Sequence, residues 1–274
     1  MTLLETIIRR KREEVAAARR RASPAASRDA ELPPPRDFAA ALRGPGLSVI
    51  AEFKRRSPSR GLIRADADPA TVATVYERAG ASAVSVLTDS TWFGGVAADL
   101  TTVKRTVGLP VLRKDFLIDV FQLQESQTIG ADAVLLIARI LDDAALREFI
   151  HAAAASGMTA LVEVHDEREL DRAIDAGARI IGVNNRDLDT LNVDTGTATR
   201  LRPQIPMDCV AVAESGIHSR EDMTRMRDAG YDAVLIGETL MTADDPAAKI
   251  AELTGPDVQR AGRLSPRADR HANS

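Results

Sequence analysis

The chain has 274 residues, of which 28% are charged, and its formal net charge at pH 7 is only −4. A chain of this length can bury a large core, and a charge so nearly balanced makes no basic field that would attract nucleic acid or an anionic membrane. The single cysteine, Cys209, excludes an intrachain disulfide and a cysteine-rich metal cluster. We therefore expect a soluble, cytoplasmic protein without nucleic-acid or membrane partners.

Residues 1–34 are predicted to form an amphipathic helix and a linker that pack on the main domain. Four apolar residues recur near helical spacing, which places them on one face: Leu4, Ile7, Ile8 and Val15. We interpret the basic residues beside them as a solvated face, with binding to a membrane surface or nucleic acid as the alternative. Three prolines at 33–35 cannot continue a helix.

Residues 35–254 repeat a pattern in which a glycine separates a helical stretch from an apolar run. The four glycines lie about 50 residues apart: Gly80, Gly130, Gly177 and Gly230. Glycine suits a helix end because it accepts a positive φ, and the apolar run is typical of a strand buried on both faces. Each repeat has the length of two strand–helix units, so it marks every second strand.

Eight apolar runs alternate with eight helical stretches along this segment. The predicted strands are 49–53, 83–87, 110–112, 133–137, 160–164, 180–183, 209–213 and 233–236. The predicted helices are 69–79, 98–107, 118–128, 143–155, 167–176, 196–202, 219–229 and 245–253. This alternation predicts an α/β fold, a closed (βα)8 TIM barrel with an extra N-terminal helix. An open doubly wound sheet is the alternative, but no glycine fingerprint for a nucleotide is present. Residues 255–274 are expected to be a disordered tail.

Charged residues follow the predicted strands at their C-terminal ends, where the active site of a barrel lies. Because side chains alternate along a strand, Glu52 and Lys54 share the inward face with Ile50. Lys114 and Glu163 occupy the ends of two further strands. Lysine and glutamate enclosed together can act as general acid and base without a metal or cofactor, since burial and neighbouring charges shift their pKa values. A structural ion-pair network in the barrel mouth is the alternative.

Two loops are suited to bind an anion. Ser215 and Gly216 follow the seventh predicted strand, and Gly237 and Glu238 follow the eighth. Small residues there let backbone N–H groups approach a phosphate, although the glycines could serve only as turn formers. The four histidines offer no metal-binding set, and we expect a supporting or structural role for His165, the one nearest the site.

Five segments together resemble the indole-3-glycerol-phosphate synthase family. They are IAEFKRRSPSRG at 50–61, PVLRKDF at 110–116, LVEVH at 161–165, GVNNRDL at 182–188 and AESGI at 213–217. The resemblance implies ring closure, decarboxylation and dehydration of 1-(2-carboxyphenylamino)-1-deoxyribulose 5-phosphate to indole-3-glycerol phosphate in tryptophan biosynthesis. The implied partner is this small phosphorylated substrate, and the choice between a monomer and a weak homodimer stays open.

The resemblance also implies residue roles. Lys114 is the ring-closure acid, and Glu163, Lys54 and Glu52 share the other acid–base and electrostatic work, with the dehydration step open among them. Asn184 and Ser215 orient substrate hydroxyls and these side chains. The anchors for the substrate's phosphate and carboxylate are Ser57, Arg186, Gly216, Gly237 and Glu238, the last through its backbone. Phe116, with Trp92 or Phe93, packs on the substrate ring.

The sequence departs from the family pattern at Arg60, where lysine is expected, and at Phe53, where a small aliphatic residue is common. Two other functions remain open. Phosphoribosylanthranilate isomerase is a neighbouring barrel that works through a cysteine and an aspartate, but Cys209 begins a strand, at the opposite face. A catalytically silent phosphate-binding barrel has no need of Lys54, Lys114 and Glu163 together.

Overall fold

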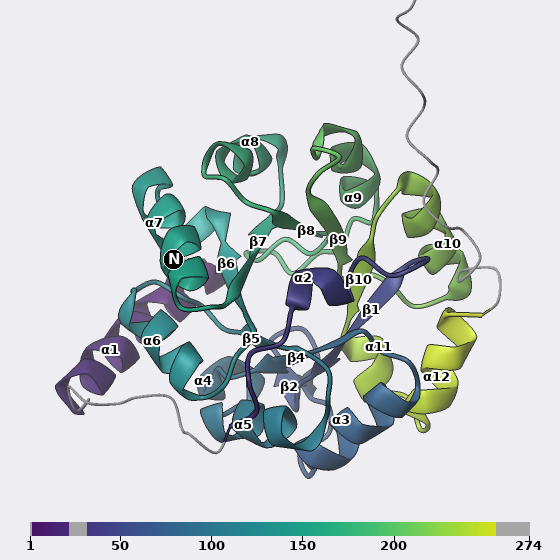
Figure 1. The fold of residues 1–274 in the computed structure, drawn as a ribbon, viewed down its shortest axis with the longest axis horizontal. Coiled ribbons are helices and arrows are strands. Elements are labelled where there is room, and N and C mark those ends of the chain that lie inside the picture. Colours follow the sequence, from purple (N-terminus) through teal and green to yellow (C-terminus); the bar gives the residue numbers. More distant parts are fainter. Residues whose placement is uncertain (1, 22–31, 256–274) are drawn as a thin grey trace, which may run out of the picture.

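The computed structural model describes residues 2–21 and 32–255 (Figure 1). Most of the expected linker, and all of the expected tail beyond Gly255, lie outside these ranges. Among the helices that the structure describes, none is long and apolar enough to cross a lipid bilayer.

Eight parallel strands form a closed barrel, because β1 pairs with both β4 and β10. The strands are β1 (Ser48–Phe53), β4 (Ala83–Leu87), β5 (Val111–Lys114), β6 (Ala133–Ile137), β7 (Thr159–Val164), β8 (Ile180–Asn184), β9 (Val210–Glu214) and β10 (Ala233–Ile236). This confirms the predicted barrel and excludes the open sheet. Two predicted strands are displaced: β5 runs on through Arg113 and Lys114, and β9 through Glu214. Both strands continue because the backbone hydrogen bonds to the neighbouring strands extend beyond the last apolar side chain.

The eight predicted helices surround the barrel (Figure 1). They are α3 (Pro69–Arg78), α5 (Ala97–Thr106), α6 (Phe121–Thr128), α7 (Asp143–Ala155), α8 (Glu167–Asp175), α9 (Gly196–Leu201), α10 (Arg220–Ala229) and α12 (Pro246–Leu253). Only α6 begins clearly later than predicted. Its approach is held as a turn, in which Ile118 donates its N–H to Gln122 Oε1 and Phe121 donates to Asp119 Oδ1.

Several short elements were not predicted from the sequence. They are α2 (Phe38–Ala41), α4 (Ser90–Phe93), α11 (Glu238–Met241), the 3-10 turns η1 (Ala138–Ile140) and η2 (Arg202–Gln204), and the hairpin of β2 (Arg56–Ser57) and β3 (Gly61–Leu62). Helix α2 lies across the centre of the barrel in Figure 1. Its Phe38 and the following Leu42 are fully buried against the inner apolar layer, so α2 closes one end of the barrel.

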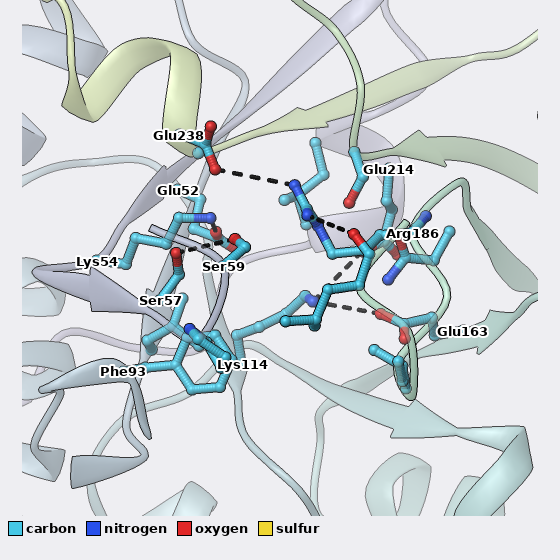
Figure 2. Close-up of a pocket in the computed structure, with 18 of the residues that line it drawn as sticks. Glu52, Lys54, Ser57, Ser59, Phe93, Lys114, Glu163, Arg186, Glu214 and Glu238 are labelled. Atoms are coloured by element: carbon cyan, nitrogen blue, oxygen red, sulfur yellow. Dashed lines mark hydrogen bonds and ion pairs between the residues drawn. The ribbon is translucent and has the colours of Figure 1, made fainter. Parts of the chain in front are cut away.

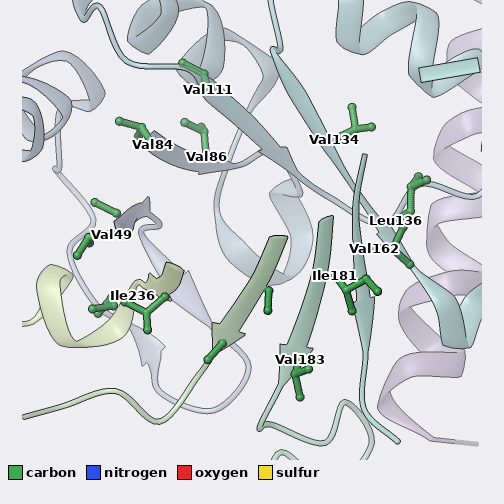
Figure 3. Packing of buried hydrophobic residues seen from close by; sticks show 14 of the residues in the cluster. Val49, Val84, Val86, Val111, Val134, Leu136, Val162, Ile181, Val183 and Ile236 are labelled. Atoms are coloured by element: carbon green, nitrogen blue, oxygen red, sulfur yellow. The ribbon is translucent and has the colours of Figure 1, made fainter. Parts of the chain in front are cut away.

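Strand side chains alternate between two cores. Outward residues such as Val49 and Phe53 pack beneath the surrounding helices (Figure 3). Inward residues such as Ile50, Leu112 and Leu161 fill the barrel. Phe53, the departure from the family pattern, therefore faces the helices, where the Arg55 guanidinium lies 4.9 Å from its ring centre.

Helix α1 (Leu3–Arg21) packs on the barrel through one apolar face, as predicted. Leu4, Ile7 and Val15 are buried on this face, whereas Ile8 is half-buried. Lys11 is buried too, and its Nζ lies 2.8 Å from Asp89 Oδ2 and 2.9 Å from Asp115 Oδ1. Burial alone would lower the pKa of Lys11, but the two carboxylates outweigh it and raise the pKa.

The repeat has a structural basis beyond its glycines, whose φ values of 89°, 92°, 87° and 94° confirm the expected left-handed helix ends. In two of the repeats an aspartate follows, and its carboxylate accepts a backbone N–H at the first or second residue of the preceding strand. Asp132 accepts from Val111, and Asp232 accepts from Ala211, each at 2.9 Å. Asp132 also lies 2.7 Å from Lys104 Nζ, and both side chains are fully buried.

We predict that Asp132→Ala lowers the free energy of unfolding by about 3–5 kcal/mol, because it removes the carboxylate that faces the fully buried Lys104 ammonium at 2.7 Å. Urea unfolding measures the change. Asp208→Ala is the matched control, since Asp208 pairs with Arg179 at the exposed surface and should cost less than about 1 kcal/mol. Equal small losses in both variants would contradict this account of the buried pair.

Candidate active site

A pocket lies at the C-terminal ends of the barrel strands (Figure 2). Thirteen of the fourteen site residues predicted from the sequence line it: Glu52, Lys54, Ser57, Phe93, Lys114, Phe116, Glu163, Asn184, Arg186, Ser215, Gly216, Gly237 and Glu238. The exception is Trp92, which packs half-buried beside the inner core. These thirteen residues therefore lie together at one end of the barrel.

Lys114 is the centre of the polar wall. Its Nζ lies 3.2 Å from Glu163 Oε2 and 3.4 Å from Glu214 Oε2. Burial by itself would lower the pKa of Lys114, but attraction to Glu163, Glu214 and Glu52 raises it overall. Lys114 is therefore held as an ammonium ion.

A second pair, Lys54 and Glu52, comes from the end of β1. Lys54 Nζ lies 2.8 Å from Glu52 Oε1, and Ser85 donates to the other Glu52 oxygen at 3.4 Å. Burial opposes ionisation of Glu52, but Lys54 and then Lys114 hold its pKa below the usual range. The pocket thus contains two separate acid–base pairs.

Glu214 is a site residue to which the sequence interpretation gave no role, although it stands in the AESGI segment directly after the seventh predicted strand. It lies opposite Asn184 in the β8–β9 register, and only 1% of it is exposed. Burial raises the pKa of Glu214 to about 8, and the Glu163 and Glu52 carboxylates add to the rise against the attraction of Lys114. Glu214 therefore carries a proton at neutral pH while Glu163 is ionised.

One signal in the sequence could have found Glu214. Gly182 lies inside β8, where glycine is unfavourable unless something approaches closely. A Cβ at Gly182 would overlap Glu214 Oε1. The Glu214 carboxyl group thus occupies the space that a side chain at residue 182 would fill.

The two predicted anion loops face the pocket together. Ser215 and Gly216 both have left-handed backbones, with φ values of 64° and 77°. A Cβ at Gly216 would lie 2.8 Å from Thr195 Cγ2. A Cβ at Gly237 would overlap Glu52 Oε1 and lie 2.9 Å from Lys54 Nζ. Both glycines are therefore needed because neighbouring side chains approach their backbones closely, and not only because they form turns.

The Glu238 side chain connects two sides of the pocket mouth. Its carboxylate lies 2.8 Å from Arg60 Nε. It also lies 3.8 Å from Arg186 Nη2 (Figure 2). The expected contribution of Glu238 was its backbone alone, so this bridge is an addition. Arg60, where lysine was expected, still supplies a cation at that position.

The remaining wall is apolar. The rings of Phe93 and Phe116 lie with centroids 6.2 Å apart and tilted by 39°. Leu3, Leu4 and Ile7 of α1 also line the pocket, which makes the N-terminal helix part of the site. This side suits a flat aromatic group, and of the two aromatic candidates in α4 the structure favours Phe93 over Trp92.

Within residues 2–21 and 32–255, no three or more His, Cys, Asp or Glu side chains are arranged to hold a metal ion. Cys209 is buried just before β9, at the opposite end of that strand from Glu214. This position disfavours the isomerase alternative, which needs a cysteine in the pocket.

Solved structures of low sequence identity share the fold. The 3-hexulose-6-phosphate synthase of Salmonella typhimurium aligns with a TM-score of 0.62 at 15% identity, covering 78% of this chain and 98% of that one. A thiamine phosphate pyrophosphorylase from Pyrococcus furiosus aligns with a TM-score of 0.56 at 15% identity, covering 77% and 95%. These likenesses concern the barrel alone.

Sequence relatives are much closer. The chain is 50% identical over 238 residues to an indole-3-glycerol phosphate synthase of Parafrankia sp., covering 87% of this chain and 89% of the relative. It is also 50% identical over 226 residues to indole-3-glycerol phosphate synthase 1 of Streptomyces coelicolor, covering 82% and 84%. The family model for indole-3-glycerol phosphate synthase matches residues 4–253. The resemblance of the five segments is thereby confirmed, and the chain belongs to the indole-3-glycerol phosphate synthase family.

Proposed function

We propose that this pocket closes the indole ring of 1-(2-carboxyphenylamino)-1-deoxyribulose 5-phosphate, with loss of carbon dioxide and water, to give indole-3-glycerol phosphate. The activity is that of a carboxy-lyase in tryptophan biosynthesis. The observation that carries the proposal is the Lys114 ammonium, buried between Glu163 and Glu214 at the end of β5. It offers an acid whose side chain is 15% exposed at the pocket wall.

Lys114 acts as the acid of ring closure. An ammonium group has three N–H donors, and two carboxyl groups occupy two of them, which leaves one for the substrate's ketone oxygen. As the new carbon–carbon bond forms, negative charge develops on that oxygen and the proton passes to it. Departure of carbon dioxide then restores the aromatic ring. The protonated Glu214 lies within reach to return a proton to Lys114.

The Lys54–Glu52 pair performs the dehydration. The leaving hydroxyl needs an acid, and the proton lost from the neighbouring carbon of the new ring needs a base; these two groups are already paired at 2.8 Å. Glu163 is engaged with Lys114, which supports an electrostatic role for it. Asn184 and Ser215, on neighbouring strand ends, orient the substrate hydroxyls.

The substrate's anions bind on the other sides of the pocket. Gly216 and Gly237 admit the phosphate to their backbones, with the Glu238 backbone beside it and Ser57 contributing its hydroxyl. Arg186 pairs with the carboxylate that later leaves as carbon dioxide. The anthranilate ring packs between Phe93 and Phe116, where the apolar wall matches it.

We also propose that the enzyme works in the cytoplasm, as a monomer or weak homodimer, without a nucleic-acid or membrane partner. The low net charge and the single, buried cysteine support this setting. The division into an N-terminal segment at 1–34, a barrel domain at 35–254 and a tail at 255–274 is part of the same proposal.

Lys114→Ala should lower kcat by at least about 10³-fold, because it removes the acid and leaves Glu163 without its counterion. Indole formation is followed by absorbance and fluorescence from the carboxyphenylamino-deoxyribulose phosphate. Lys249→Ala, on the outer helix α12, is the matched control and should keep wild-type turnover. If folded wild-type protein binds the substrate without turnover, the chain is the silent phosphate-binding barrel instead.

Glu214→Gln should stabilise the folded protein at alkaline pH. The folded-state pKa of Glu214, about 8, exceeds the ordinary glutamate value of 4.5, so the folded state holds an extra proton between these values. Stability from this group is complete below pH 4.5 and is lost as pH rises to 8, by up to about 1.4 kcal/mol per unit. Urea unfolding at pH 5, 7 and 9 should show the gain of Glu214→Gln growing with pH. A gain that is independent of pH would refute the assigned protonation.

Gly237→Ala should raise KM by about 10-fold or more, because the added Cβ displaces Glu52 and Lys54 and narrows the phosphate loop. Steady-state kinetics and titration with inorganic phosphate measure the two effects. Gly44→Ala is the control, since its Cβ would meet Ser48 Oγ at an ordinary 3.7 Å. Unchanged phosphate binding in Gly237→Ala would place the phosphate elsewhere.

A further inference from the structure

Arg60 and Glu238 form an ion pair across the mouth of the pocket. Arg60 belongs to the turn between β2 and β3, and Glu238 is the first residue of α11, directly after Gly237. Arg60 Nε lies 2.8 Å from Glu238 Oε1, and 62% of the Arg60 side chain is exposed against 16% for Glu238. An ion pair with one partner so exposed contributes little to the stability of a fold. Its main effect is therefore on the charge at the mouth of the pocket.

The Glu238 side chain carries a negative charge into the part of the pocket to which we assign the substrate's phosphate. It lines the pocket together with Ser57, Gly216 and Gly237, which we propose as phosphate-binding residues. A phosphate monoester has a charge of about −1.5 to −2 at pH 7, so a carboxylate beside it repels it. Even in water, a unit charge about 6 Å away lowers the affinity for a doubly charged anion by roughly tenfold.

The other cations that line the pocket have partners of their own. The two pocket lysines face Glu52 at 2.8 Å and Glu163 at 3.2 Å. Arg186 lies 3.8 Å from Glu238 (Figure 2), and we assign it to the substrate's carboxylate. The shorter contact, from Arg60, is therefore the one that offsets the Glu238 charge when substrate binds.

The turn that carries Arg60 is fixed to the same part of the site. The backbone N–H of Arg60 donates to Ser57 Oγ at 3.2 Å, and Ser57 Oγ lies 3.2 Å from Ser59 Oγ. Ser57 is buried, so this turn is fixed at its base while the Arg60 side chain extends to Glu238. Arg60 thus reaches the phosphate-binding part of the pocket from the segment after β1, and Glu238 reaches it from the end of β10.

We propose that Arg60 makes the pocket selective for a phosphorylated substrate, because its guanidinium neutralises the Glu238 carboxylate and so lets a doubly charged phosphate bind beside it. The inference rests on the proposed function and adds a specificity-determining residue to it. Arg60 acts through Glu238 and takes no part in proton transfer. Its removal should therefore change KM and leave kcat nearly constant.

Arg60→Gln removes the charge and keeps most of the length of the side chain. It should raise the Kd of inorganic phosphate, measured by calorimetric titration, and the KM of the carboxyphenylamino-deoxyribulose phosphate by about 10-fold each, with less than about a 2-fold change in kcat. Arg60→Lys keeps the cation and should recover most of the loss. Arg200→Gln breaks an exposed ion pair with Glu167 on the outer helices, and it is the control with unchanged binding.

A second substitution separates neutralisation of Glu238 from a direct contact with the phosphate. In Arg60→Gln/Glu238→Gln the repelling carboxylate is removed as well, so the affinity for phosphate should return to within about 3-fold of wild type. The KM values of the variants should follow the same order. A double variant that binds phosphate as weakly as Arg60→Gln would overturn the proposal, because the effect of Arg60 would then be independent of Glu238.

Two further outcomes distinguish the inference from the function on which it rests. Wild-type phosphate affinity and KM in folded Arg60→Gln would overturn the role of Arg60 and leave the proposed reaction intact. Absence of turnover by folded wild-type protein would refute the proposed reaction, whereas the phosphate titrations would still decide whether Arg60 neutralises Glu238.

Discussion

One buried charge, the Lys114 ammonium, determines the arrangement of the barrel mouth. Three carboxyl groups converge on it from β1, β7 and β9, and each loses most of its hydration. Burying so many charges costs several kcal/mol for each ion unless the geometry compensates. The two lysines can balance only two of the three carboxyl groups, so one of the three keeps its proton. Glu214 is that group, and the excess of carboxyl groups thereby places a proton donor beside the Lys114 ammonium.

The rest of the fold keeps this cluster away from water. Inward residues such as Ile50 and Leu161 fill the barrel below it, and α1 covers it from above with Leu4 and Ile7. Helix α1 is fixed by more than apolar contact, since Lys11 pairs with Asp115, the residue next to Lys114. The buried ion pair between Lys11 and Asp115 therefore holds helix α1 against the end of β5.

Sequence periodicity was sufficient for the barrel because each buried strand is an apolar run and each helix ends at a glycine or turn. It gave no role to Glu214, although this residue directly follows the seventh apolar run, because its burial beside Lys114 and Glu163 is a property of the folded barrel. Periodicity could not decide whether Trp92 or Phe93 faces the pocket. The two residues are adjacent in one short helix, and only the packing of that helix determines which side chain points inward. The hairpin after β1 and the short helices depend on tertiary contacts, and no local pattern predicts them.

Two glycines connect the polar wall to the rest of the site in a way that motif reasoning did not predict. Gly182 leaves space for the Glu214 carboxyl group, and Gly237 leaves space for the Lys54–Glu52 pair. Gly237 is also the residue at which we place the substrate's phosphate. The loop at Gly237 and the Lys54–Glu52 pair therefore form one wall of the pocket, and a side chain at residue 237 would not fit between them. A phosphate seated on that loop would fix the distance from the sugar carbons to Lys54 and Glu52, so that binding of the remote phosphate aligns the groups that act on the leaving hydroxyl.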